Sequence, residues 1–335
     1  MTLKIAAIFK YVIIFIAGLF LLWLAIRNLD LQKTYDDVIN AKWSWVWLSL
    51  VFSALAFVIR AQRWNMLIEP SGYKPKLSNT SYSVMFGYFA NLGLPRLGEV
   101  TRCAALSRKE KIPFEILIGT VIVERALDML TLLIALFALL FIEYGTMRDF
   151  LLDNVFSQLT PVKFIYAGGA AVFIFLVFVL FMKSKYSKPF REKILSIWHG
   201  VIKGFKSILK IKHAGWFIFH SLFIWILYYL STWCCFYALA STSALGWREA
   251  IFALAVGGIG MSAPVNGGIG AYELLVSKGL MLFNISESDG ITFALLVHAT
   301  QILLIIASGL FAIAMMGLTP NRNARTEDPV QSASE

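Results

Sequence analysis

Residues 86–102 read FGYFANLGLPRLGEVTR and lie between two apolar stretches. The centre of this segment cannot be one continuous helix, because Gly93, Pro95 and Gly98 interrupt the helical hydrogen-bond ladder. Unpaired backbone groups in hydrocarbon cost several kcal/mol each, so a break at membrane depth has to be enclosed by protein or water. We therefore expect the first break, which lies between Leu92 and Gly98, to be an enclosed polar site.

A second break of the same kind spans residues 262–273, which read SAPVNGGIGAYE. A proline, a glycine cluster and a glutamate again separate two apolar halves. The halves are too short to cross a bilayer: Ser78–Leu92 as a helix covers about 22 Å of a hydrocarbon core of about 30 Å. Two corresponding broken segments are typical of transporters. We predict two re-entrant hairpins, each made of a broken helix.

Composition places the chain among integral membrane proteins. Of its 335 residues, 59% are hydrophobic and only 15% are charged, which excludes an ordinary soluble domain. We predict an all-α, polytopic bundle of transmembrane helices. The three cysteines have neither a disulfide nor a metal-binding spacing, so we expect no metal and no cofactor. The net charge of +10 lies in loops beside apolar runs, which favours anionic lipid over nucleic acid as the partner.

The distribution of basic residues predicts the topology. Residues 183–212 hold nine of them, whereas residues 284–290 hold none, so we place the first loop in the cytoplasm and the second outside. Apolar residues recur at helical spacing within 183–212, which predicts an amphipathic helix on the anionic leaflet or, alternatively, a regulatory docking helix. The nine are Lys183, Lys185, Lys188, Arg191, Lys193, Lys203, Lys206, Lys210 and Lys212.

This assignment makes the two hairpins an inverted pair whose tips meet near the middle of the membrane. It implies six crossings, with both termini in the cytoplasm, in an inner or plasma membrane. We predict one transmembrane domain over residues 1–318 and a disordered cytoplasmic tail over residues 319–335.

Several charged residues lie within or beside the apolar runs. Arg60 and Arg63 share a helical face and suit a phosphate, although they also suit snorkelling to the interface. Glu124, Arg125 and Asp128 interrupt the apolar run 113–142, where each costs about 2.5 to 3.5 kcal/mol at the centre of a lipid-exposed helix. They must face protein or water. Glu124 and Asp128 share a face that can bracket an arginine or another cation, while Arg125 is expected to project elsewhere.

The glycine cluster of the second break has two interpretations. Backbone amides of Gly267, Gly268 and Gly270 at the start of a half-helix favour an anion such as a lipid phosphate, or the glycines serve only tight helix packing. The four histidines have no metal-binding spacing, and no serine or cysteine forms a nucleophile motif with one of them. We therefore do not expect an enzyme.

A set of motifs extends over nearly the whole chain: Arg60 with Arg63-Trp64, Asn91 with Pro95-Arg96-Leu97-Gly98-Glu99 and Arg102, Glu124-Arg125 with Asp128, and Pro264 with Gly267-Gly268-Ile269-Gly270 and Glu273. With these motifs the chain resembles the flippase-like membrane proteins related to the transmembrane part of lysylphosphatidylglycerol synthase, the multiple peptide resistance factor. This chain departs from the family pattern at two places, which affects how its residues align with the motif positions. The family often has an extra residue between the proline and the arginine of the first break, and often a second proline where this chain has Asn266.

The resemblance implies a protein that binds or moves anionic phospholipid or polyprenyl-phosphate-linked headgroups. In that interpretation Arg60, Arg63, Arg96 and Arg102 engage the phosphate, with Asn91 and the glycines beside them. Glu99 and Glu273 hold these cations or a headgroup amine. The soluble domain that adds lysine in the full synthase is not in this sequence, so we expect no aminoacyl-lipid synthesis.

Two other functions remain open. One is an intramembrane transferase acting on a lipid-linked substrate, with Glu99 or Asp128 as general base. The other is a non-transporting scaffold for a lipid-modifying enzyme.

Overall fold

The computed structural model describes residues 2–27, 29–93, 97–142, 145 and 213–324. Within these residues the chain forms ten α-helices and no strand, so the all-α prediction is confirmed. The chain divides into two compact units, Met1–Arg125 with Lys210–Glu335, and Ala126–Leu209. The predicted span at 161–182, the basic loop 183–212 and Arg96 lie outside the described residues. One domain over 1–318 stays a prediction.

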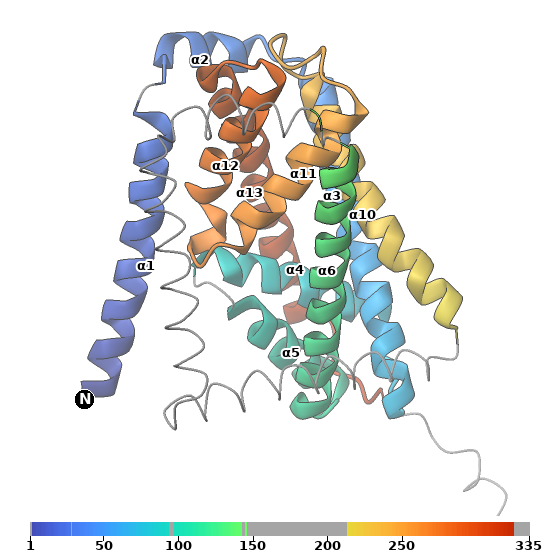
Figure 1. The fold of residues 1–335 in the computed structure, drawn as a ribbon. Helices are drawn as coiled ribbons and strands as arrows, with labels where there is room; N and C mark the ends of the chain where they lie inside the picture. Colours follow the sequence, from blue (N-terminus) through green and yellow to red (C-terminus); the bar gives the residue numbers. More distant parts are fainter. Residues whose placement is uncertain (1, 28, 94–96, 143–144, 146–212, 325–335) are drawn as a thin grey trace, which may run out of the picture. The chain divides into compact units, whose positions relative to one another are not determined.

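The first unit holds nearly all of the described helices (Figure 1). Of the described helices, α6 is the one that continues from the first unit into the second. The helices are α1 (Thr2–Ile26), α2 (Leu31–Ile39), α3 (Trp43–Ile68), α4 (Leu77–Gly93), α5 (Leu97–Glu110), α6 (Phe114–Ile142), α10 (Ala214–Phe236), α11 (Trp247–Ser262), α12 (Ala271–Leu280) and α13 (Glu287–Leu318).

Three described helices are long and apolar enough to cross a membrane: α3 with the turn after it, α10 and α13. The number rises to four if Ile14–Ile26 and Leu31–Ile39, which meet at 91°, count as one bent span. Large apolar side chains such as Phe15, Trp47, Phe219 and Leu303 are exposed on these helices. Exposed apolar faces of this extent suit contact with lipid. The six predicted crossings and the position of both termini stay predictions.

The first break separates α4 from α5, as predicted, and the two helices lie side by side (Figure 1). Their backbones approach so closely that a Cβ atom on Gly98 would lie 2.2 Å from the carbonyl oxygen of Gly87. Asn91 Oδ1 accepts a hydrogen bond of 2.6 Å from the amide of Gly98. This bond satisfies one of the amides that the first turn of α5 leaves without a helical partner. The glycine pair and the cap hold the hairpin closed.

The second break separates α11 from α12 and contains a short 3₁₀ turn, Asn266–Gly268. Gly270 has a φ of +82°, and a Cβ atom there would lie 2.4 Å from the amide nitrogen of Leu22 on α1. The residue therefore has to be glycine, both for its backbone angle and for close packing against α1.

The tips of the two hairpins touch. Asn266 Nδ2 donates a hydrogen bond of 2.8 Å to the carbonyl oxygen of Gly93, the last residue of α4. Leu92 packs against the backbone of Gly267 in the same place. The predicted meeting of the tips is confirmed. Their depth in the membrane and their inverted entry from opposite sides stay predictions.

The first residues of the segment predicted to be a disordered tail have a defined position. The amides of Arg322 and Ala324 donate to the carbonyl oxygens of Lys109 and Glu110, at 2.6 and 2.9 Å. The Lys74 amide donates to Ala324 at 2.8 Å. The disorder prediction is therefore wrong for residues 319–324. The end of α5 leaves carbonyl groups without helical partners, and the extended chain satisfies them.

Candidate anion-binding site

Four arginines from three helices converge on one carboxylate, that of Glu124 on α6. Arg60 Nη1 lies 2.5 Å from Glu124 Oε1, and Arg63 Nη2 lies 3.2 Å from the same oxygen. Arg102 Nη2 lies 3.0 Å from Oε2. Arg125 Nη2 lies 3.2 Å from Oε1. We call these five residues the arginine cluster.

The cluster is mostly buried and concentrates guanidinium groups around one carboxylate. Glu124 is 0% exposed, and Arg60, Arg63 and Arg102 are 5%, 1% and 4% exposed. The side chain of Arg125 is 42% exposed, so it forms the open side of the cluster. Within the cluster one carboxylate faces four guanidiniums. Buried guanidiniums are costly to desolvate, so they are retained where they pair with carboxylates or bind an anion.

Surrounding side chains fix the guanidiniums in place. The guanidinium of Arg102 lies over the ring of Trp64, 4.7 Å from its centroid. Trp64 is itself held, because its Nε1 donates a 2.8 Å hydrogen bond to Thr120 Oγ1. Arg60 Nη2 donates to the hydroxyl of Tyr228 on α10 at 3.2 Å. These contacts orient the arginines before any ligand binds.

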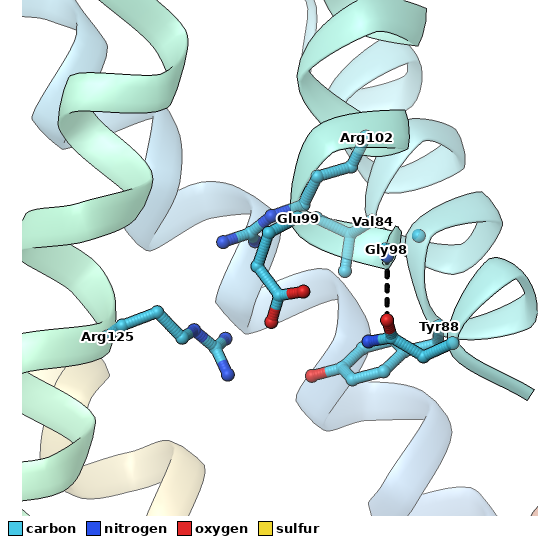
Figure 2. Close-up of a pocket in the computed structure, with 8 residues that line it drawn as sticks. Val84, Tyr88, Gly98, Glu99, Arg102 and Arg125 are labelled. Atoms are coloured by element: carbon cyan, nitrogen blue, oxygen red, sulfur yellow. Dashed lines mark hydrogen bonds between the residues drawn. The ribbon is translucent and has the colours of Figure 1, made fainter. Parts of the chain in front are cut away.

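A small cavity lies beside the cluster, against the first hairpin. Its volume is about 30 Å³, enough for one or two water molecules. Figure 2 shows the carboxylate of Glu99 between Arg102 and Arg125. Glu99 Oε2 is buried and accepts no hydrogen bond from the residues that the structure describes. A lipid headgroup is larger than this cavity, so it can enter only if the hairpin or Arg125 moves. The lining residues are Val84, Gly87, Tyr88, Asn91, Gly98, Glu99, Arg102 and Arg125.

Comparison with known proteins identifies the family. A family model described as the lysylphosphatidylglycerol synthase TM region matches residues 7–309. The chain belongs to this family. A UPF0104 membrane protein of Methanocaldococcus jannaschii is 31% identical over 151 residues, which are 44% of this chain and 44% of that protein. The match thus spans less than half of the relative's length. No solved structure matches the chain.

In this member of the lysylphosphatidylglycerol synthase TM region family, the structure brings together five of the predicted site residues. Arg60, Arg63 and Arg102 meet in the cluster, and Asn91 and Glu99 line the cavity beside it. The expected pairing of Glu124 with an arginine is confirmed. Asp128 belongs to the second unit, and its place in the charge network stays a prediction.

The prediction for Arg125 is wrong. Although adjacent residues on a helix start out in different directions, the long side chain of Arg125 folds back to the carboxylate of Glu124.

The polar groups of the second hairpin have other partners than the sequence predicted. Glu273 was expected to hold an arginine or a headgroup amine, but its Oε1 lies 2.6 Å from His298 Nδ1 on α13. Its Oε2 accepts a 2.7 Å hydrogen bond from the amide of Gly270. The Gly268 amide donates to the carbonyl of Val265. The amides of Gly268 and Gly270 thus already have protein partners, as does the Gly98 amide through Asn91.

Sequence reasoning missed His298 and Tyr228 as site residues. A signal for His298 existed, because an ionisable residue within a predicted span indicates a functional site by default. Tyr228 carried no such signal. Tyrosine is common in membrane helices, and only the packing of α10 against α3 brings its hydroxyl to Arg60.

Proposed function

We propose that the chain is a lipid transporter or flippase whose arginine cluster binds the headgroup phosphate of an anionic phospholipid or of a polyprenyl-phosphate-linked lipid. The observation that carries the proposal is the convergence of four guanidiniums, three of them buried, around one carboxylate in a multi-pass membrane protein. Arginine binds phosphate through parallel, charge-assisted hydrogen bonds, which are about twice as strong as neutral ones. Membership of a family named after a lipid-synthesising enzyme supports the same class of ligand.

In the proposed cycle Glu124 and Glu99 are the resting partners of the arginines. A phosphate that enters from the side replaces these carboxylates as the hydrogen-bond partner of Arg125 and Arg102. Arg60 and Arg63 stay bonded to Glu124. Arg96, which lies outside the described residues, is proposed from the sequence to engage the phosphate as well. Because the tips of both hairpins touch at Gly93 and Asn266, separation of the tips opens the route from one side of the membrane to the other.

The proposal makes the protein a carrier or binder of lipid and not an enzyme. It places the protein in the inner or plasma membrane, with lipid as its principal partner and no role for nucleic acid. A lipid-modifying enzyme that supplies the transported lipid is a further proposed partner. The transferase alternative draws on one observation, the buried Glu99 Oε2 without a hydrogen bond, which suits a general base.

Replacing Arg102 with glutamine is expected to slow lipid movement about ten- to a hundredfold. The expectation follows from losing a hydrogen bond to a charged group, worth about 1.5 to 3 kcal/mol. The fold should persist, because three arginines still hold Glu124. The measurement is the rate at which purified protein in liposomes moves labelled phospholipid and polyprenyl lipids, with lipid binding followed by native mass spectrometry.

Arg248→Gln is the matched control, since Arg248 is exposed beside Trp247 and outside the cluster. It should move lipid at the wild-type rate. Melting temperatures of both variants separate a binding defect from unfolding. If wild-type protein neither moves nor binds any of these lipids above the protein-free background, the transport proposal is abandoned. Chemical conversion of the lipid would favour the transferase.

A further inference from the structure

Glu273 and His298 form a second buried pair of ionisable residues, separate from the arginine cluster. Glu273 is 3% exposed and His298 is 4% exposed. His298 Nδ1 lies 2.6 Å from Glu273 Oε1, and His298 Nε2 lies 3.0 Å from the carbonyl oxygen of Gly267. The histidine therefore joins α13 to α12 and to the tip of the second hairpin. The proposed headgroup site uses neither of these contacts.

The geometry determines how many protons the pair holds. A backbone carbonyl only accepts hydrogen bonds, so Nε2 of His298 must carry a proton to bond Gly267. Between Nδ1 and the carboxylate a second proton is needed, either on the imidazole or on Glu273, because two lone pairs 2.6 Å apart repel. The pair thus holds one proton more than a carboxylate beside a neutral imidazole.

Loss of that proton changes the contact with the hairpin tip. The remaining proton is drawn to Nδ1, where it forms a charge-assisted bond to the carboxylate. Nε2 then presents a lone pair to the carbonyl of Gly267, and the bond between them is lost. Gly267 follows Asn266, whose side chain holds the carbonyl of Gly93 in the first hairpin. The bond that depends on the proton is therefore made by Gly267, the residue next to the one that joins the two tips.

Among the described residues that the contacts below place around His298, Glu273 is the charged one. From α12, Tyr272 lies with its ring centroid 4.9 Å from that of His298. Cys235 on α10 neighbours Tyr272. On α4, Tyr82 packs on Phe311 of α13, and on α3, Ser53 bonds Gln301 of α13. Tyrosine and cysteine are uncharged at neutral pH. The 3₁₀ turn of the tip has no ionisable side chain, and the Lys33–Asp289 pair lies at the first turn of α13, more than two turns of helix from His298.

We propose that Glu273 and His298 are a proton-binding site that fastens the tip of the second hairpin when the proton is bound and releases the tip when it leaves. The proton site gives the hairpin two states that differ by one proton and one hydrogen bond. If the chain moves lipid as proposed above, tip release becomes a step at which a proton gradient drives that movement. The proton site itself does not depend on lipid transport.

The test measures the hairpin tip directly in lipid-free detergent. Hydrogen–deuterium exchange of the amides of residues 265–270, corrected for the intrinsic effect of pH, is recorded across the pH range in which wild-type protein stays folded. Exchange at the tip should rise about fivefold or more as the pair loses its proton. Nitrogen NMR of histidine-labelled protein should show Nε2 of His298 protonated at the low end of this range and unprotonated at the high end.

Two conservative variants remove the titration and keep the tip bond. In Glu273→Gln, the glutamine amide donates to Nδ1, so a neutral His298 donates to Gly267 at every pH. In His298→Gln, the glutamine amide donates to Gly267 without titrating. Tip exchange in both variants should be independent of pH. His220→Gln is the control, because His220 bonds the carbonyl of Trp216 on α10, away from the tip, and it should keep the wild-type pH dependence.

A wild-type tip whose corrected exchange does not change with pH overturns the proposal, as does a control variant that loses the dependence. If neither conservative variant folds, the wild-type NMR titration decides, because an Nε2 that keeps its protonation state at all pH values overturns the proposal too. A separate arm compares lipid movement with and without a pH gradient. A pH-dependent tip in a protein that moves no lipid would refute the transport proposal and leave the proton site standing.

Discussion

Replacing Glu124 with alanine is expected to lower the free energy of unfolding by about 3 to 5 kcal/mol. The substitution removes the one carboxylate to which four arginines bind. Three of those arginines are buried and would lose the carboxylate that they share. The measurement is thermal or denaturant unfolding of purified protein in detergent. Glu124→Gln retains an acceptor without the charge and should lose less stability than Glu124→Ala.

Glu115→Ala is the matched control, because Glu115 lies on the same helix but is exposed. A change at an exposed position should stay within about 0.5 kcal/mol. If Glu124→Ala melts at the wild-type temperature, the arginines are compensated by something other than this carboxylate, and the account of the cluster fails.

Replacing Gly98 with alanine is expected to cost about 3 kcal/mol or more, at the upper end of the range for overpacking. The added methyl group would lie 2.2 Å from the carbonyl oxygen of Gly87 and 2.6 Å from the amide group of Asn91. The first of these neighbours is backbone, so a change of rotamer cannot relieve the contact. The two helices of the first hairpin must separate, which also removes the Asn91 cap from α5.

Gly93→Ala is the control for this effect, since it places a methyl group in the same hairpin where nothing lies within 4 Å. It should leave the melting temperature near the wild-type value. Equal destabilisation by both substitutions would show that the hairpin does not depend on the contact between Gly87 and Gly98.

The break positions were predictable because their causes are local. Proline removes a backbone donor and glycine weakens a helix wherever they occur, so α4 ends at Gly93 and α11 ends at Ser262, close to the predicted positions. The need for Glu124 to find a cation was equally predictable, because the cost of burying a carboxylate depends on its chemistry and not on its neighbours.

The partners were predicted less well, because sequence spacing does not show which helices touch. Helical periodicity predicted that Arg125 and Glu124 would point in different directions. The Arg125 side chain is long enough to reach the Glu124 carboxylate all the same. Glu273 was assigned to arginines of the first break, whereas α13 places His298 against it. The sequence cannot distinguish glycine amides that bind a lipid phosphate from glycine amides that bond to the protein. Only the folded chain shows that the amide of Gly268 donates to Val265 and that of Gly270 to Glu273.

By itself, the sequence determined that this protein is an all-α membrane protein with two broken helices and with buried charges that must be paired. Apolar content, backbone restrictions and desolvation costs are properties of residue types and short segments, so they can be read without the fold. The tertiary structure alone decided that four arginines share Glu124, that the hairpin tips meet through Asn266, and that His298 joins Glu273 to the second tip. Apart from the adjacent Arg125 and Glu124, these pairings link residues 22 to 173 positions apart, and they exist only because packed helices bring their side chains within hydrogen-bonding distance.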